Sequence, residues 1–227
     1  MWTLYRHSNG KVYLRLGTAL HSESYEPLEV YRTVYDNDRS STWARPREMF
    51  YEEVAPGRKR FTEVGRVRTM MPEDRAIYLA FGHDAWGGGS SVEEFVSSYA
   101  HNKNHLRGTR YLLESPSGEP IGNLNTIRFA RGLVGIASLS VNPSQRSRGY
   151  GSILTRAVME ILRCEDPGIR FMLCSEGKLS MYERIGFSRL PNDVQFHLPA
   201  VAMATGDAPF TERELSFLKD YFTAAIR

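Results

Sequence analysis

The chain has 227 residues, of which 41% are hydrophobic and 24% are charged, and its formal net charge at pH 7 is +3. This composition is typical of an ordinary globular protein with room for one large domain or two small ones. The small net charge provides no basic stripe of the kind that nucleic-acid binding requires, so we expect no nucleic-acid partner.

The first residues and the cysteines favour a cytoplasmic protein. The start, "MWTLYRHSNGK", lacks the apolar core of a signal peptide. No apolar run approaches the roughly 20 residues of a membrane-spanning helix, so we expect no membrane partner. Cys164 and Cys174 match no metal-binding or redox spacing, and we therefore expect reduced thiols and no metal site.

Residues 1–62 are dense in β-strand signals. Strand-like runs occupy 11–20 and 26–35, and a short strand that begins at residue 42 is ended by Pro46. Between them, "DNDRSS" at 36–41 has the Asp and Asn residues of a turn. No convincing long helix is present, so the sequence predicts a small, partly open, all-β barrel-like domain. Its expected core comprises Tyr5, Val12, Leu14, Val30, Tyr31, Trp43 and Phe50.

This segment resembles a short bacterial domain family of unknown function. The shared stretches are "YRH" (5–7), "LGTALHSES" (16–24), "LEVYRTVY" (28–35), "WARPREMF" (43–50) and "RF" (60–61). The resemblance names a module but no activity. His7, His21, Trp43 and Arg45 either hold the small barrel together or bind a ligand, and the sequence leaves both readings open.

Pro56 and Gly57 predict a linker at 54–65, and the chain beyond it has a mixed α/β pattern. We expect a second domain at 65–205 and a C-terminal helix within 206–227. Strands are predicted at 65–70, 110–115, 121–130, 133–141, 169–175 and 194–204. Helices are predicted at 71–86, 91–105, 178–187 and 211–226, with a further helix that buries an apolar stripe from Ile153 to Leu162.

A glycine loop, "NPSQRSRGYGSILTRAV" (142–158), stands between a predicted strand and the helix with the apolar stripe. The dinucleotide fingerprint requires a third glycine where Leu154 stands. The nucleotide-triphosphate loop fails at the only Gly-Lys pair, 177–178, because Met172 and Leu179 replace the required glycine and hydroxyl. The remaining interpretation is an anion held by backbone N–H groups at a helix start.

With this loop the chain resembles the GCN5-related N-acetyltransferases (GNATs) over residues 65–204. The coenzyme A loop of that family, [Q/R]-x-x-G-x-[G/A], is matched by residues 146–151, and the strand before it ends "SVNP". "MYERIGF" (181–187) matches the family's Tyr-x-x-x-Gly-Phe element. The resemblance implies an α/β (α+β) GNAT fold with a mixed, splayed central sheet.

The resemblance also implies a site for acetyl-CoA. Its pantetheine arm would lie along the strand at 133–141, and its pyrophosphate would bind the loop. The residues that match these positions are Leu139, Ser140, Val141, Arg146, Ser147, Arg148, Gly149, Tyr150, Gly151 and Ser152. A backbone N–H near Val141 would stabilise the oxyanion that forms when an amine attacks the thioester.

Tyr182 matches the family tyrosine that protonates the leaving thiolate. The alternative is that it is one more buried aromatic residue with a satisfied hydroxyl. The strand at 133–141 has no acid, so the base that some relatives carry there is missing. Glu176 is one candidate base, although an exposed acid near a helix start is the plainer reading. Cys174 reads as a small core residue more than a nucleophile.

Other candidates for the base are Ser138 and Ser140, through a relay water, and His83 or Asp84. Residues 82–91 and 188–204 are expected to shape the acceptor site, the first as a mobile lid. Asp84 and Trp86 there would receive a cationic or sugar-like amine, unless the segment is a plain surface loop.

The resulting hypothesis is an acetyl-CoA-dependent N-acetyltransferase that acts on an amine of a small molecule or peptide. The alternative is a non-catalytic acyl-CoA-binding sensor or scaffold whose N-terminal barrel recruits a partner. The sequence leaves the oligomeric state open, with a homodimer as one candidate assembly.

Overall fold

The computed structural model describes residues 1–101, 107–130, 132–177 and 179–221. Its helices are α1 (Arg47–Tyr51), α2 (Arg75–Ala80), α3 (His83–Trp86), α4 (Val92–His101), α6 (Tyr150–Glu165), α7 (Leu179–Glu183) and α8 (Glu212–Lys219). Its strands are β1 (Trp2–His7), β2 (Val12–Leu20), β3 (Pro27–Thr33), β4 (Thr42–Pro46), β5 (Glu53–Ala55), β6 (Arg58–Lys59), β7 (Phe61–Thr69), β8 (Thr109–Glu114), β9 (Pro120–Ala130), β10 (Leu133–Val141), β11 (Arg170–Ser175), β12 (Phe187–Arg189) and β13 (Val201–Thr205).

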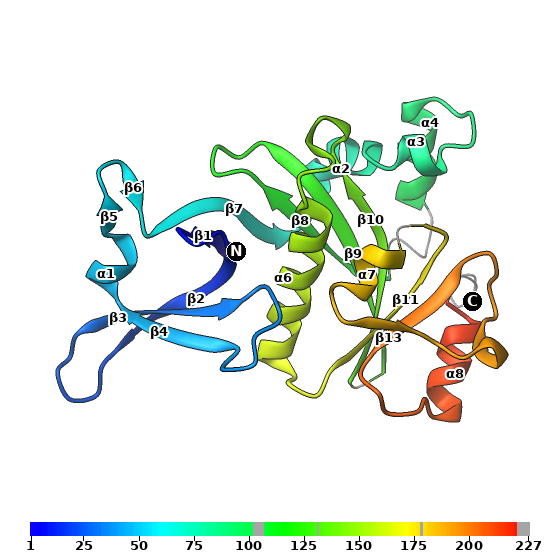
Figure 1. The fold of residues 1–227 in the computed structure, drawn as a ribbon. Helices are drawn as coiled ribbons and strands as arrows, with labels where there is room; N and C mark the ends of the chain where they lie inside the picture. The colour runs from blue at the N-terminus through cyan, green and yellow to red at the C-terminus, as the bar shows by residue number, and fades with distance from the viewer. Residues whose placement is uncertain (102–106, 131, 178, 222–227) are drawn as a thin grey trace.

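Eleven of the described strands form one mixed sheet. Their order is β12-β13-β11-β10-β9-β8-β7-β1-β2-β3-β4, and β10 and β11 are the pair that runs parallel. The crossover between these two strands contains α6, as parallel neighbours require. Figure 1 shows the two ends of this sheet on opposite sides of α6. The mixed sheet with flanking helices confirms the predicted α/β fold class.

The N-terminal strands are antiparallel and continue the main sheet. β1 pairs with both β2 and β7, and β7 pairs in turn with β8. Within the described residues β4 pairs with β3 alone, so this end of the sheet is open. The position of β4 explains one error, because Trp43 on this edge strand is 36% exposed and does not belong to the core. Val12, Leu14, Tyr31 and Phe50 are buried as predicted, whereas Tyr5 and Val30 are half-buried.

The linker predicted at 54–65 is wrong. Pro56 and Gly57 form the turn of the β5–β6 hairpin, and β7 begins at Phe61 and runs on to Thr69. A single strand therefore crosses the expected boundary between residues 62 and 65. The division into segments 1–62, 65–205 and 206–227 stays a prediction.

One hydrophobic core spans the expected boundary. Leu4, Val12 and Leu14 from the N-terminal strands belong to the same buried cluster as Leu154 and Val158 of α6. This is the apolar stripe that the 3.6-residue spacing predicts. The N-terminal strands therefore cover one side of α6 through apolar contact.

Ion pairs reinforce the contact between the N-terminal strands and α6. Arg156 on α6 binds both carboxylate oxygens of Asp36, at 2.9 and 2.8 Å, and its guanidinium also donates to the carbonyl of Arg184. Arg32 on β3 pairs with Glu160 on α6. The helix after the glycine loop is thus held by charged as well as apolar groups of the N-terminal segment.

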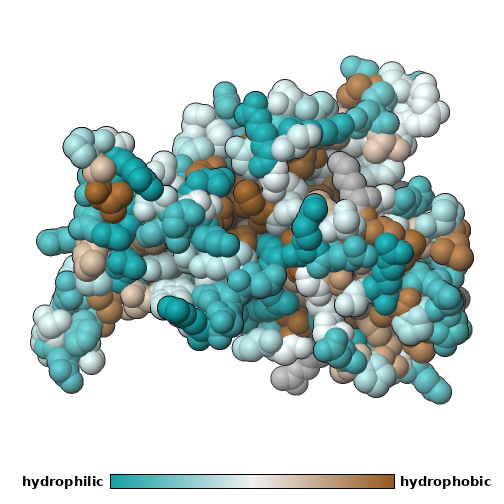
Figure 2. Space-filling model, in the orientation of Figure 1, coloured by the Kyte–Doolittle hydropathy of each residue, from teal (hydrophilic) through white to brown (hydrophobic). Residues whose placement is uncertain are grey.

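Several predicted elements are shorter than expected. The helix at 71–86 is divided into a 3-10 turn (Pro72–Asp74), α2 and α3, and the strand at 194–204 is reduced to β13. Parts of three predicted helices, at 102–105, 178 and 222–226, lie outside the described residues. Figure 2 shows a mostly hydrophilic face with hydrophobic residues in small patches. Of the helices that the structure describes, none combines the length and the apolar character that crossing a membrane demands.

Substitution of Gly65 tests how tightly β7, the strand that joins the two parts of the sheet, is packed against β8. Gly65 is buried on β7, and a Cβ added there would lie 2.7 Å from the backbone oxygen of Glu114. Because backbone must move to relieve this contact, Gly65→Ala is expected to lower the free energy of unfolding by about 1–3 kcal/mol in urea denaturation. Gly168→Ala, whose Cβ would meet only an Asp166 oxygen at 3.7 Å, is the control. Equal midpoints for the two variants would contradict tight packing at β7.

Candidate functional site

The site begins where two neighbouring strands separate. β10 pairs with β11 at Leu133–Arg170, Val134–Phe171 and Gly135–Met172, and no further pairing of these strands occurs within their described residues. β11 stays paired with β13 as far as Ser175, and β10 stays paired with β9 as far as Val141, so the sheet opens between β10 and β11. The predicted splay of the central sheet is thus present, and it leaves the edge of β10 from Ile136 onward facing a gap.

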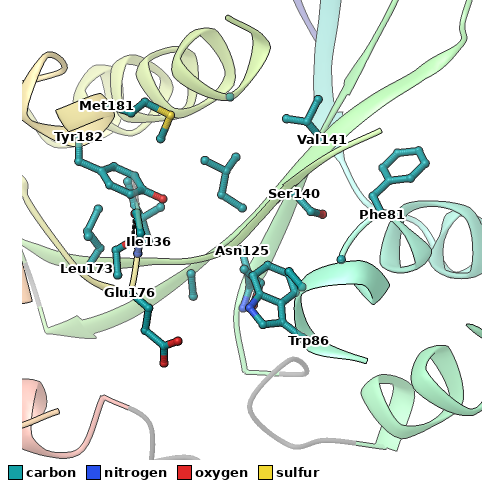
Figure 3. A pocket seen from close by; sticks show the side chains of 18 of the residues that line it. Phe81, Trp86, Asn125, Ile136, Ser140, Val141, Leu173, Glu176, Met181 and Tyr182 are labelled. Atoms are coloured by element: carbon teal, nitrogen blue, oxygen red, sulfur yellow. Dashed lines mark hydrogen bonds between the residues drawn. The ribbon is translucent and has the colours of Figure 1, made fainter. Parts of the chain in front are cut away.

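A cavity of about 950 Å³ fills this gap and continues along the glycine loop. Its walls come from β9, β10, the end of β11, the segment 81–86, the loop before α6, and α7. Figure 3 shows Tyr182 and Met181 on one side of it and Trp86 and Phe81 on the other, with β10 between them. This volume is typical of a small-molecule site.

A distortion of β10 accompanies the gap. Ser138 has φ of +50°, a left-handed backbone that non-glycine residues rarely adopt. The pairing of β10 with β9 also shifts register between Ala137 and Ser140. A bulge of this kind bends a strand and re-aims its side chains, and it commonly lies beside a functional site.

Two carbonyl groups of the open strand are capped by distant side chains. The hydroxyl of the buried Tyr221 donates to the carbonyl of Ile136. Nε of Arg146 donates to the carbonyl of Val141 at 3.1 Å. Backbone groups removed from a sheet need other partners, and these two side chains supply them at either end of the gap.

The glycine loop is shaped as a cradle for an anion. Ser147 and Gly149 both have positive φ, at +64° and +80°, and such alternation curls a backbone so that successive N–H groups converge. Gly149 is the N-cap of α6, and no side chain caps the helix there. None of the described hydrogen bonds uses the N–H groups of Tyr150, Gly151 or Ser152. These donors and the dipole of a 16-residue helix favour a bound anion.

Arg146 and Asp84 are not placed as the sequence analysis expected. The sequence predicts Arg146 as a coenzyme A-binding residue and Asp84 as a receptor for an amine, but the two form a bidentate ion pair. The same guanidinium donates to the carbonyl of Phe81 at 3.1 Å. The hydrogen bond from Arg146 lowers the pKa of Asp84. This pair joins the loop to the segment 81–86, so the expected lid is tied down at this point.

Tyr182 lies on α7 and faces the cavity (Figure 3). Its ring packs edge-on against Phe187, with 5.9 Å between the ring centroids. Burial raises the pKa of Tyr182 to about 12, so the phenol keeps its proton at neutral pH. No described residue makes a hydrogen bond to its hydroxyl. The reading in which this hydroxyl is satisfied within the protein is therefore not supported.

The other predicted catalytic groups differ in their surroundings. Glu176 is exposed at the end of β11 and lines the cavity (Figure 3). Burial raises the pKa of the neighbouring Cys174 to about 12, so this thiol stays protonated and is a poor nucleophile. Nε2 of His83 lies 2.7 Å from the carbonyl oxygen of Ser90, and His83 does not line the cavity. Ser140 Oγ accepts from Asn123 at 2.8 Å.

The remaining predicted binding residues are brought together, with one exception. The predicted residues that line the cavity are Leu139, Ser140, Val141, Arg146, Ser147, Gly149, Tyr150, Gly151 and Ser152. Arg148 is exposed and does not line it. Of the segment 188–204, expected to shape the acceptor site, Ala200 is the residue that reaches the wall.

Asn125 on β9 also lines the cavity and is labelled in Figure 3, but it was not predicted as a site residue. This side chain is 1% exposed, and neither its amide nitrogen nor its amide oxygen has a hydrogen-bond partner among the described residues. A buried amide normally has partners, so an orphaned one in a cavity wall indicates a polar ligand. Tyr99, Phe129 and Tyr221 also line the cavity and were not singled out. The signal for Asn125 was its spacing from Asn123, which puts two amides on one face of a buried strand.

Comparisons with known families match the two resemblances. Residues 79–187 match the family model described as Acetyltransferase (GNAT) family, and residues 3–63 match the one described as Protein of unknown function (DUF1653). Both resemblances drawn from the sequence are thereby confirmed. Among curated proteins, none matches the chain significantly.

Three solved structures illustrate the matches to known folds. A spermidine N-acetyltransferase SpeG chimera from Vibrio cholerae and hSSAT is 14% identical, covering 62% of this chain and 94% of its own, with a TM-score of 0.49. The PaiA N-acetyltransferase from Thermoplasma acidophilum, in complex with coenzyme A, is 14% identical over 63% and 99%, with a TM-score of 0.49. AAC(6')-Ib in complex with ribostamycin and coenzyme A is 25% identical over 63% and 93%, with a TM-score of 0.47.

The Arg146–Asp84 pair makes a testable prediction. Both side chains are partly exposed, at 35% and 52%, so the pair is expected to contribute less than about 1 kcal/mol to global stability. Its effect is local: Asp84→Asn is expected to speed amide hydrogen exchange in residues 81–87 without a change in unfolding midpoint. Arg66→Ala, which breaks the remote Arg66–Glu63 pair, should leave that exchange unaltered. Unchanged exchange in Asp84→Asn would show that the segment is held by other contacts.

Proposed function

We propose that this chain, which carries a GNAT acetyltransferase domain after a domain of unknown function, transfers an acetyl group from acetyl-CoA to an amine of a small molecule or peptide. The observation that carries the proposal is a main-chain anion cradle at the mouth of the gap between β10 and β11. The hydroxyl of Tyr182 faces the same gap. Solved GNAT structures that match the chain include complexes with coenzyme A.

The cavity fits acetyl-CoA, which supplies the acetyl group as a thioester. The N–H groups of Tyr150, Gly151 and Ser152, which make none of the described hydrogen bonds, would hold the pyrophosphate at the start of α6, where the helix dipole would add to their effect. Leu139 and Ser140, on the open edge of β10, would line the pantetheine arm. In this proposal the arginines do little of the binding, since Arg146 is already paired and Arg148 lies outside the wall.

Tyr182 is proposed as the general acid. Its pKa of about 12 lies far above neutral pH, so the phenol is protonated and able to donate to the sulfur as the C–S bond breaks. Glu176 is proposed to accept the proton that the attacking amine loses, through water, because its carboxylate lies at the exposed end of the cavity. The amide of Asn125, which has no hydrogen-bond partner among the described residues, would form a hydrogen bond with the amine substrate on the wall of the cavity opposite Tyr182.

The second candidate function is an acyl-CoA-binding sensor or scaffold that does not catalyse transfer. The missing acid on β10 favours it, while the position of Tyr182 favours the enzyme. Thiol release from acetyl-CoA over a panel of primary amines separates the two. Binding of coenzyme A without thiol release for any amine would support the sensor and overturn the enzyme. The cytoplasmic location and a homodimeric assembly stay predictions.

Substitution of Tyr182 tests the general acid. Tyr182→Phe is expected to lower kcat roughly 100-fold, since the leaving sulfur loses its proton donor, while affinity for coenzyme A stays within about twofold. Steady-state thiol release and calorimetry measure these two quantities. Because the pKa of Tyr182 is raised, the wild-type rate should not fall through ionisation of this phenol until pH approaches 12. An unchanged kcat in Tyr182→Phe would remove the residue from the mechanism.

Gly149 tests the anion cradle. A Cβ there would meet no atom within 4 Å, so the constraint is its φ of +80° and not lack of space. The left-handed conformation is especially unfavourable for a β-branched residue, so Gly149→Val should rearrange the loop and weaken coenzyme A binding at least tenfold. Gly177→Ala, at a glycine that lines the same cavity but has no left-handed φ and no close neighbour, should bind normally in the same calorimetric assay. Normal binding by Gly149→Val would place the pyrophosphate elsewhere.

A further inference from the structure

A second cavity, which we call the N-terminal pocket, lies among β1–β4 and β7. Its volume is about 340 Å³, near the lower end of the range for small-molecule sites. Aromatic side chains from four strands and the 34–41 turn line much of it: Tyr13, Tyr31, Tyr35, Trp43 and Phe61. It shares no lining residue with the cavity at the glycine loop.

The rings of the N-terminal pocket are held in place. The hydroxyl groups of Tyr13 and Tyr35 are hydrogen-bonded at 2.7 Å, and the rings of Tyr13 and Tyr31 meet edge to face at 5.3 Å. The indole N–H of Trp43 donates to the carbonyl of Ser40 at 3.0 Å. Trp43, misplaced in the core by the sequence analysis, therefore presents a partly exposed ring with a defined orientation. Such preorganisation lowers the entropy cost of binding a planar group.

The same pocket carries two guanidinium groups without a described carboxylate partner. Arg45 donates from Nε to the hydroxyl of Tyr31 at 3.3 Å, and neither it nor Arg39 forms an ion pair within the described residues. The neighbouring Arg15, Arg47 and Arg60 all pair with glutamates. No aspartate or glutamate lines the pocket.

The local field is correspondingly positive. The pKa of His7, which lines the pocket, is lowered first by burial and then by the charges of Arg45, Arg60 and Arg58. An aromatic wall beside unpaired guanidinium groups suits a planar ring that carries an oxyanion, because guanidinium binds such groups through two parallel hydrogen bonds.

We propose that the N-terminal pocket binds a small planar aromatic compound bearing a phosphate or carboxylate group, of about the size of a nucleoside monophosphate. Its ring packs against Trp43 and the tyrosines, and its oxyanion binds Arg39 and Arg45. The binding does not depend on acetyl transfer and is independent of the function proposed above. The small charge excess of residues 1–62, with 10 Lys and Arg against 8 Asp and Glu, favours a small ligand over a polyanion.

The positions of the three tryptophans allow an experiment to show which cavity a ligand occupies. Trp43 lines the N-terminal pocket, Trp86 lines the other cavity, and Trp2 lines neither. The full chain labelled with 5-fluorotryptophan provides a ¹⁹F resonance for each, assigned by single Trp→Phe variants. Uridine 5′-monophosphate is the phosphate probe and indole-3-acetate the carboxylate probe. Uridine and inorganic phosphate at the same concentrations test the ring and the anion separately.

The expected result is a saturable shift of the Trp43 resonance with at least one of the two probes and a far weaker response to uridine or phosphate alone. Arg45→Gln should lower the affinity about 10- to 100-fold, as expected for a charge-assisted hydrogen bond, and Arg39→Gln should lower it as well. Arg47→Gln, a substitution in the adjacent helix at a residue paired with Glu29, is the matched control and should bind normally.

Three results would overturn the proposal. The first is that neither probe moves the Trp43 resonance. The second is that uridine 5′-monophosphate moves it and uridine moves it by an equal amount. The third is that both arginine variants bind like the Arg47→Gln control. A shift of Trp86 alone would locate the probe in the other cavity and likewise reject the N-terminal pocket. Circular dichroism of each variant checks that the fold is kept.

Discussion

The separation of β10 from β11 after Gly135 and Met172 is the constraint on which the rest of the site depends. Parallel strands usually stay paired along their length, since unpaired backbone groups in a protein interior are costly. Here the pairing ends inside the sheet, and the gap becomes a binding cavity because flanking elements hold it open. α6 fills one face with apolar side chains, and its N-terminus provides donors at the mouth of the gap.

The gap is kept in shape by side chains from remote parts of the chain. Tyr221, in the C-terminal segment, caps the carbonyl of Ile136, and Arg146 caps that of Val141. Arg146 also binds Asp84, so a single guanidinium connects the strand, the glycine loop and the segment before α4. The backbone cradle thus has a fixed position relative to both walls, which is what binding of a long, jointed ligand requires.

The features that the sequence predicted correctly are those that depend on local residue patterns. Period-two and 3.6-residue spacings located the strands and α6, and the loop and Tyr182 motifs located one wall of the cavity. Partners distant in sequence were not predictable, which is why neither the Arg146–Asp84 ion pair nor the unpartnered amide of Asn125 was predicted. The prediction that Trp43 belongs to the core was wrong. The alternation of apolar and polar residues identifies one face of a strand, but it does not show whether other residues cover that face. The linker was wrong because Pro56 and Gly57 serve equally well in a hairpin turn.

β7 has a consequence for how the chain is divided. The two family matches end and begin at residues 63 and 79, yet β7 spans Phe61–Thr69 and is hydrogen-bonded on one side to β1 and on the other to β8. Excision of the N-terminal strands would turn β7 into a bare sheet edge with unsatisfied backbone groups and uncover apolar surface on α6. Such edges recruit strands from other molecules, so the isolated acetyltransferase segment would be prone to aggregation. The boundary between the two families in the sequence therefore falls at a strand, β7, whose backbone hydrogen bonds join both parts of the sheet in the folded protein.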